Sequence, residues 1–200
     1  MKEPAIFLDR DGTITDMVYY PEHALVDSPC SPAQLTLIEG AGAALRSFQD
    51  LGYKLILISN QPGIAKGHFT PEIHQQMVHR LEYLLCLEGV GLTAQYYCLH
   101  HPQSKLAHYR LDCGCRKPEP GLLLEAAQEH DISLRDSITI GDGLTDVLAG
   151  KQAGTETILL TTVNSLITRL IAEQGAEPNF LARNLLEAME QVQLIPQGRN

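Results

Sequence analysis

The sequence predicts an α/β fold in which a central parallel β-sheet lies between layers of helices. Short apolar runs of strand length alternate with segments of helical periodicity along the chain, which is typical of repeated strand-helix-strand units. These runs are continuous instead of alternating with polar residues, as expected for strands covered on both faces. The candidate strands are residues 5–9, 54–59, 94–98, 137–141 and 156–160, with a short sixth at 179–182.

Four segments between the predicted strands have the periodicity of amphipathic helices, at residues 41–51, 71–88, 119–130 and 144–153. Thr70 followed by Pro71 is a signal for the start of the second helix. Within that helix Cys86 follows two leucines, and we expect it to be buried. Two further segments, 14–39 and 99–117, are too long for tight connections, so they are expected to form loops over a functional site.

Length and composition fit one domain over residues 1–193, followed by a flexible tail at 194–200. A chain of 200 residues with 44% hydrophobic content can bury a full core without disulfide bonds. A net charge of −9 argues against nucleic-acid binding, which relies on clustered Lys and Arg side chains. The N-terminus lacks the apolar stretch of a signal peptide, and no apolar run has the length of a membrane span. We therefore expect a cytoplasmic, monomeric protein that does not enter a membrane.

Charged and hydroxyl side chains follow the predicted strands at the points where these end. Ligands of parallel sheets bind outside the carboxyl ends of the strands, so these side chains are expected to form one site. Several carboxylates at one sheet edge require a compensating cation, and Mg²⁺ prefers oxygen ligands. We expect Asp9, Asp142 and a main-chain carbonyl near Asp11 to bind it. The residues that carry the predicted site are Asp9, Asp11, Ser59, Lys117 and Asp142.

This group of residues suits phosphoryl transfer through a covalent intermediate. Asp9 is the predicted nucleophile, and Asp11 is predicted to protonate the leaving group and then to activate water. Ser59 and Lys117 would stabilise the equatorial phosphoryl oxygens. Each motif alone is ambiguous, because Asp-x-Asp-Gly often forms a turn and aspartates often cap helices. Their joint occurrence in this order favours the catalytic interpretation.

Three of the five cysteines cluster with a histidine and predict a zinc-binding loop over residues 98–117. The two pairs are separated by 12 residues, and their ligand set would be Cys98, His100, Cys113 and Cys115. Zinc with four protein ligands has no open position, so its role would be structural. Either His101 or His108 could replace His100, and reduced cysteines without a metal are the alternative. The loop would lie beside the active site and position Arg116 and Lys117.

Residues 7–13, 59–61, 117–118 and 141–146 together resemble the four motifs of the haloacid dehalogenase (HAD) superfamily. That resemblance implies a Rossmann-like three-layer α/β/α core, dependence on Mg²⁺, and the catalytic roles given above. It also implies that Asp146 supports the metal from outside its ligand shell.

The zinc motif and the sequence after Ser59 narrow the resemblance to a subfamily of heptose-bisphosphate and histidinol-phosphate phosphatases. This subfamily lacks a large cap domain and acts on small phosphorylated metabolites. The resemblance implies that Arg116 contacts a substrate phosphate or hydroxyl and that Asn60 helps to hold the substrate. Two departures are that Gly143 replaces a lysine usual in the heptose enzymes and that segment 14–39 is several residues longer.

The expected reaction is therefore removal of the 7-phosphate from D-glycero-D-manno-heptose 1,7-bisphosphate, in the synthesis of lipopolysaccharide precursors. Histidinol phosphate or another sugar phosphate is the alternative substrate. A non-catalytic protein that binds phosphorylated metabolites is a rival from a different class, although the intact set of Asp9, Asp11 and Lys117 disfavours it. A phosphomutase would need a closing cap, and no inserted segment of that size is present.

Overall fold

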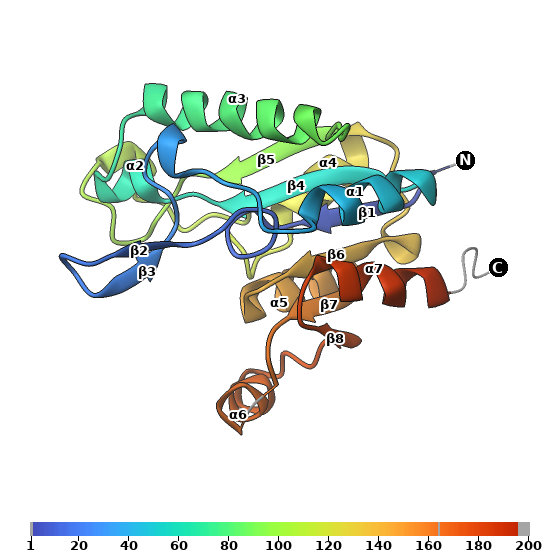
Figure 1. Ribbon diagram of the computed structural model, residues 1–200. Helices are drawn as coiled ribbons and strands as arrows, with labels where there is room; N and C mark the ends of the chain where they lie inside the picture. The colour runs from blue at the N-terminus through green and yellow to red at the C-terminus, as the bar shows by residue number, and fades with distance from the viewer. Residues whose placement is uncertain (1, 164, 196–200) are drawn as a thin grey trace.

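A six-stranded parallel sheet in the order β5-β4-β1-β6-β7-β8 forms the centre of the protein (Figure 1). It is seen in a computed structural model that describes residues 2–163 and 165–195. The strands are β1 (Ala5–Leu8), β4 (Lys54–Asn60), β5 (Ala94–Cys98), β6 (Ile138–Gly141), β7 (Glu156–Leu160) and β8 (Phe180–Ala182). Each lies within one residue of its predicted bounds, and the predicted α/β class with a parallel sheet is confirmed.

Helices cover both faces of the sheet, which makes the three-layer sandwich expected from the sequence (Figure 1). The four predicted helices correspond to α1 (Ala41–Asp50), α3 (Pro71–Leu87), α4 (Gly121–Glu129) and α5 (Leu144–Ala153). At the start of α3 the Thr70 side chain accepts a hydrogen bond from the Ile73 backbone N–H at 3.4 Å, as the start signal predicted. The sequence analysis did not anticipate α2 (Gly63–Lys66), α6 (Ser165–Gln174) and α7 (Leu185–Leu194).

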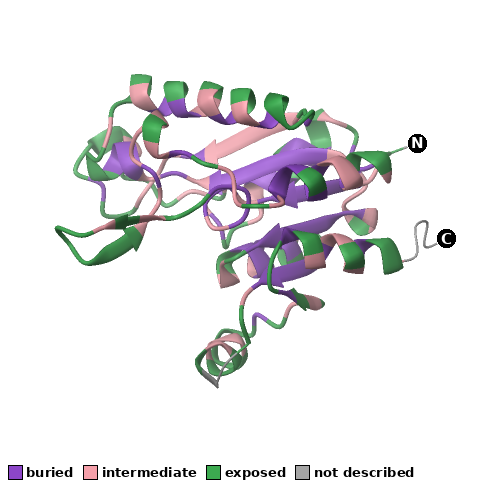
Figure 2. Cartoon of the chain, in the orientation of Figure 1, coloured by how far each residue is buried: buried purple, intermediate pink, exposed green. Residues whose placement is uncertain are grey.

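Alternate side chains of each central strand enter two separate cores, one on each face of the sheet. In β1, Ile6 and Leu8 join the core formed with α1, α3 and α7, whereas Ala5 and Phe7 join the core formed with α4 and α5. Figure 2 shows the central strands as buried and the outer faces of the helices as exposed. The strands therefore carry apolar residues on both faces, which explains why their sequences are continuously apolar.

The segment 14–39 contains more regular structure than the loop that we expected. It holds the antiparallel hairpin of β2 (Val18–Tyr20) and β3 (Leu25–Asp27) and the 3-10 helix η1 (Pro32–Gln34). The hairpin projects from the body of the protein (Figure 1). Its strands have three residues each, and such short pairs leave little periodicity for a sequence to reveal.

The segment 99–117 is mostly irregular, as predicted, apart from the 3-10 helix η2 (Ala107–Tyr109). It is attached to α2 by Ser104, whose hydroxyl donates to the Ala65 carbonyl at 2.9 Å. A third 3-10 helix, η3 (Leu134–Asp136), precedes β6. In the predicted tail, Leu194 is the last residue of α7, and residues 196–200 lie outside the described part of the chain.

In the strand order, β1 lies between β4 on one side and β6 on the other, so the direction in which strands are added to the sheet reverses at β1. Ligands of such open sheets bind beside the strand at which the order reverses, outside the carboxyl ends. The residues that follow β1, β4 and β6 are therefore brought to one place by the topology. Across the described residues, the helices are too short or too polar to span a bilayer.

One buried position was wrongly predicted, because Cys86 on α3 is exposed. The side chains of α3 that face the core include Met77, Leu81 and Leu85, and Cys86 lies about 100° around the helix from Leu85. A residue next to an apolar position in a helix does not share its face.

We expect Phe48→Ala to destabilise the fold strongly. The Phe48 side chain on α1 is fully buried, and its loss should lower the free energy of unfolding by about 3–5 kcal/mol through lost burial and a residual cavity. Urea denaturation followed by circular dichroism would measure the change. Leu87→Ala is the control because Leu87 is 66% exposed, and an equal loss in both variants would contradict the assigned core.

Candidate active site and metal centres

Asp9 and Asp142 follow the adjacent parallel strands β1 and β6 and lie close to each other above the sheet edge. Two glycines permit this approach. A Cβ atom on Gly12 would lie 2.2 Å from Asp142 Oδ2, and one on Gly141 would lie 2.3 Å from Asp146 Cγ. Gly12 also has φ +79°, a backbone conformation that other residues rarely adopt. The glycines in these motifs therefore make room for carboxyl groups.

Lys117 connects these carboxylates to the end of β4. Its Nζ lies 2.8 Å from Asp9 Oδ1 and 2.5 Å from Asp146 Oδ1, and it donates to the Ile58 carbonyl at 2.9 Å. These three partners use all three N–H groups of the ammonium. Burial is the largest single effect on the pKa of Lys117 and lowers it. The carboxylates of Asp146 and Asp9 together outweigh burial and raise this pKa above its usual range. The lysine is charged and held in place.

Asn60 holds the Lys117 backbone at the site. Its side-chain amide donates to the Lys117 carbonyl at 3.0 Å, and its side-chain oxygen accepts from the Lys117 N–H at 3.0 Å. This reciprocal pair fixes the peptide that follows the zinc loop against β4. The sequence analysis expected Asn60 to hold substrate, and the structure gives it contacts with the protein chain.

Burial, together with the charges of neighbouring carboxylates, raises the pKa values of Asp142 and Asp146. The carboxyl group of Asp142 packs against Gly12, and desolvation there, with the charges of Asp9 and Asp146, raises its pKa to about 7. Desolvation raises the pKa of Asp146 to about 6, although Lys117 opposes the shift. Three carboxylates thus face a single ammonium group, which leaves negative charge for a cation to neutralise.

Asp9, Asp142 and Asp146 could hold a metal ion between them. One carboxylate oxygen of each lies within 4.8 Å of the others. In an octahedral Mg²⁺ complex, ligand oxygens at about 2.1 Å from the ion are separated by about 3 to 4 Å, so a small adjustment would suffice. Asp146 was expected to act from outside the ligand shell, and here its carboxylate lies in the same group. The all-oxygen donor set fits Mg²⁺.

The side chain of Asp11 lies outside this carboxylate group. It forms a bidentate ion pair with Arg10, at 2.9 Å from Nε to Oδ1 and 2.9 Å from Nη2 to Oδ2. The Gln61 amide and the Thr15 hydroxyl donate to the same carboxylate at 2.7 and 2.9 Å. Burial acts to raise the pKa of Asp11, but these donors outweigh it and hold the pKa below its usual value.

Ser59 lies within the same network. The Gln61 amide donates to Ser59 Oγ at 3.1 Å, so the serine oxygen is used as an acceptor and its proton can be donated to a ligand. Ser59 is nearly completely buried at the end of β4. The sequence analysis assigned no role to Arg10, Gln61 or Thr15. For Arg10 and Gln61 the only signal was their position inside the two motifs that supplied Asp11 and Ser59, and Thr15 lies just outside the first motif.

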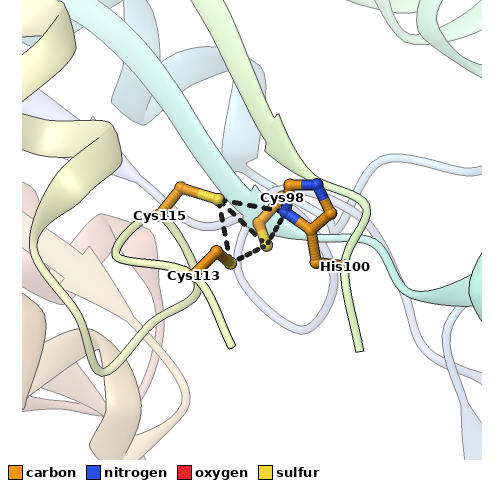
Figure 3. A group of neighbouring side chains, drawn as sticks. All are labelled: Cys98, His100, Cys113 and Cys115. Carbon is orange, nitrogen blue, oxygen red and sulfur yellow. Dashed lines mark hydrogen bonds between the residues drawn. The ribbon is translucent and has the colours of Figure 1, made fainter. Parts of the chain in front are cut away.

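Cys98, His100, Cys113 and Cys115 form a second metal-binding group, with their ligand atoms turned toward a common centre (Figure 3). The sulfur–sulfur distances are 3.1 to 3.6 Å, and the sulfurs of Cys98 and Cys115 lie 3.8 and 3.4 Å from His100 Nδ1. Tetrahedral zinc bonds of about 2.3 Å to sulfur place ligand atoms about 3.7 Å apart. The group therefore fits zinc after a slight expansion.

The histidine of this group is His100, as expected, and neither alternative takes its place. His101 Nδ1 instead accepts a hydrogen bond from the Gln103 backbone, and His108 lies against the Tyr109 ring. Cys98 ends β5, and Cys113 and Cys115 come from the far end of the loop. Arg116 Nη1 donates to the His100 carbonyl at 3.3 Å, so the group lies directly beside the residues that lead to Lys117.

Gly143 is the position at which the heptose enzymes usually carry a lysine. Its backbone N–H donates to Asp146 Oδ2 at 3.1 Å at the start of α5. A Cβ atom there would lie 3.1 Å from the same oxygen and 3.2 Å from Thr145 Oγ1. The glycine brings no charge to this position next to Asp146.

Known proteins resemble this chain over nearly its whole length. A family model described as HAD-hydrolase-like matches residues 114–188. D-glycero-beta-D-manno-heptose-1,7-bisphosphate 7-phosphatase of Pasteurella multocida is 40% identical over 165 residues, which are 82% of this chain and 84% of that protein. The protein of the same name from Haemophilus ducreyi is 36% identical over 194 residues, which are 96% of this chain and 100% of that protein.

Solved structures agree with the sequence comparisons. The crystal structure of D,D-heptose 1,7-bisphosphate phosphatase from B. bronchiseptica, complexed with magnesium and phosphate, matches with a TM-score of 0.76. The identity is 27%, and the match covers 96% of this chain and 98% of that chain. The chain belongs to the family of heptose-bisphosphate 7-phosphatases within the HAD-like hydrolases.

Proposed function

We propose that this protein is a Mg²⁺-dependent phosphatase that removes the 7-phosphate of D-glycero-D-manno-heptose 1,7-bisphosphate. The observation that carries the proposal is the meeting of Asp9, Asp142 and Lys117 at the carboxyl ends of neighbouring strands. The relatives described above are named as 7-phosphatases of heptose 1,7-bisphosphate. The related structure from B. bronchiseptica is a complex with magnesium and phosphate. Histidinol phosphate, which is not a sugar phosphate, and sugar phosphates other than the heptose bisphosphate remain the competing substrates.

In the first step, a carboxylate oxygen of Asp9 attacks phosphorus and the bond from phosphorus to the ester oxygen breaks. The departing alkoxide takes a proton from the Asp11 carboxyl group, which leaves an aspartyl-phosphate on Asp9. In the second step, Asp11 takes a proton from water, the water oxygen attacks phosphorus, and the bond from phosphorus to Asp9 breaks, which releases inorganic phosphate and restores the Asp9 carboxylate. When bound, Mg²⁺ would be held by Asp9, Asp142 and Asp146 and would neutralise charge on the phosphoryl oxygens.

Two protein groups are suited to the phosphoryl oxygens. The Ser59 hydroxyl has its oxygen engaged by Gln61 and can donate its proton outward. The Lys117 ammonium, which lies 2.8 Å from the nucleophile, balances charge that accumulates there. Arg116, which precedes Lys117 in the chain, donates one hydrogen bond to the His100 carbonyl of the zinc loop. Its other N–H groups could bind a second phosphate or a hydroxyl of the substrate.

The zinc group would act structurally, because four protein ligands leave no open coordination position. By fixing the loop at both ends, it would hold Arg116 and Lys117 over β4. The three free thiols of this group suit a reducing compartment, which supports the cytoplasm as the location. We further propose one catalytic domain over residues 1–193 that works as a monomer on a small metabolite.

A substrate panel tests the assignment. With Mg²⁺ present, phosphate release should be fastest from heptose 1,7-bisphosphate and slower both from histidinol phosphate and from sugar phosphates of other kinds. Excess EDTA should stop phosphate release until Mg²⁺ is restored. Release would be followed with a colorimetric phosphate assay. Activity confined to esters that are not sugars would reject the substrate and keep the mechanism, whereas activity that survives EDTA would reject the metal requirement.

Asp9→Asn should lower turnover by at least about 10⁴-fold, because an amide cannot form the covalent intermediate. The fold should remain, since Asp9 is partly exposed and its neighbours Lys117 and Asp146 still pair. Steady-state kinetics and a thermal melt would be compared with those of the wild type. Turnover at the wild-type rate would show that another residue is the nucleophile.

Cys113→Ser should lower zinc content and thermal stability together, because metal binding contributes to the folding of such loops. Zinc would be measured by inductively coupled plasma mass spectrometry after purification, and the melting temperature by fluorimetry. Cys86→Ser is the matched control, since Cys86 is exposed and lies outside the group. A Cys113→Ser protein that keeps its zinc would refute the ligand assignment.

A further inference from the structure

Arg10 is a fully buried arginine at the edge of the active site, and the reaction steps above give it no task. Burying a guanidinium is costly unless its charge and its N–H groups are satisfied. Here its partners are the Asp11 carboxylate and the Gln61 side-chain oxygen, which accepts from Nη2 at 2.8 Å. An apolar side chain could fill the same space, so the arginine points to a requirement imposed by Asp11.

The Asp11 carboxylate has no capacity left for chemistry in this position. Oδ1 accepts from Arg10 Nε and Thr15 Oγ1, and Oδ2 accepts from Arg10 Nη2 and Gln61 Nε2. These four donors occupy the acceptor sites that a carboxylate offers. A group held in this way neither delivers a proton to an ester oxygen nor removes one from water. Asp11 must therefore leave these partners and take up a proton from solvent before it can protonate a leaving group.

Gln61 connects this arrangement to the part of the site that receives phosphate. Its Nε2 is shared between Asp11 Oδ2 at 2.7 Å and Ser59 Oγ at 3.1 Å. Its backbone N–H donates to the Cys98 carbonyl at 2.7 Å, which fixes the residue beside the end of β5. A ligand oxygen that accepts from the Ser59 hydroxyl and shifts this side chain would therefore also pull on the amide that holds Asp11.

We propose that Arg10 and Gln61 are positioning residues that hold the Asp11 side chain in a standby position, outside the metal-binding carboxylates, until a phosphoryl group reaches Ser59. The inference rests on the proposed function, because it requires Asp11 to act as the proton donor. Without the standby contacts, the carboxylate would be free to join Asp9, Asp142 and Asp146 around the cation, where it could not protonate a leaving group. The partners thus keep one of four nearby carboxylates available for proton transfer.

Leaving-group dependence distinguishes this role from a general structural one. An alkoxide leaving group needs a proton when the ester bond breaks, whereas a 2,4-dinitrophenolate does not. The value of kcat/KM reports events up to departure of the leaving group, so it isolates this step from the later attack of water. The probes are heptose 1,7-bisphosphate, or the sugar phosphate that the wild type hydrolyses best, and 2,4-dinitrophenyl phosphate.

The variants remove the standby contacts one at a time. Gln61→Leu and Thr15→Val should each lower kcat/KM for the sugar phosphate by about tenfold and for the dinitrophenyl ester by less than about twofold. Asp11→Asn should show the same selectivity with a loss of about 10²-fold or more on the sugar phosphate. Arg10→Lys, which keeps the charge, should retain more sugar-phosphate activity than Arg10→Gln.

Thr139→Val is the matched control for Thr15→Val. It also removes a buried hydroxyl, which is paired with Thr155 at 2.7 Å away from the active site, and it should leave the ratio of the two kcat/KM values unchanged. If an Arg10 variant does not fold, Gln61→Leu and Thr15→Val still decide the question. Equal losses on both esters, or no loss on either, in these two variants would overturn the standby role. A wild-type protein that hydrolyses neither ester would refute the proposed function itself.

Discussion

The placement of the Lys117 ammonium between Asp9 and Asp146 is the interaction on which the rest of the site depends. Asp9 follows β1 and Asp146 lies in the first turn of α5, and the two carboxylates are close enough to repel each other. A positive charge that bonds to both, and also to the Ile58 carbonyl of β4, ties the end of β1 and the start of α5 to β4. Removing it would leave the buried Asp146 carboxylate without its ion-pair partner, which is more costly than the loss of one ion pair suggests.

The position of Lys117 in turn depends on elements at some distance from it. Asn60 holds its backbone through two hydrogen bonds, and the zinc group precedes it in the chain by two residues. In the loop that carries Cys113 and Cys115, no apolar side chain of residues 99–116 is buried, and most of its length has no regular secondary structure. Metal binding would supply the cohesion that packing does not, and it would do so next to the residue that most needs a fixed position.

Much of the fold could be predicted because buried parallel strands have an unmistakable composition. The six strands and four of the helices follow from apolar runs and helical periodicity, and the parallel topology alone gathers Asp9, Ser59 and Asp142. The β2–β3 hairpin was missed because three-residue strands show too little alternation. Helix α7 was also missed, although the sequence carries a start signal for it. Asn184 is a residue type that often precedes a helix, and in the structure its side chain accepts a hydrogen bond from the Glu187 backbone N–H.

Side-chain direction is the part of the site that sequence reasoning could not supply. Motif spacing placed Asp11 near Asp9, but its rotamer is set by Arg10 and Gln61, which come from two different motifs. In the same way, Asp146 lies among the carboxylates because Gly141 lacks a Cβ atom in its path. Such contacts depend on a few atoms in three dimensions, and no periodicity along the chain records them.

Gly143, at the start of α5 beside Asp146, is a glycine that its backbone conformation does not require. Its φ of −104° and ψ of 146° lie in the extended region open to every residue type, so the backbone does not demand glycine here. A side chain would crowd Asp146 and Thr145 by only a few tenths of an ångström. The backbone therefore does not require glycine at this position, and a larger residue could stand beside the carboxylate group without a change in the path of the chain.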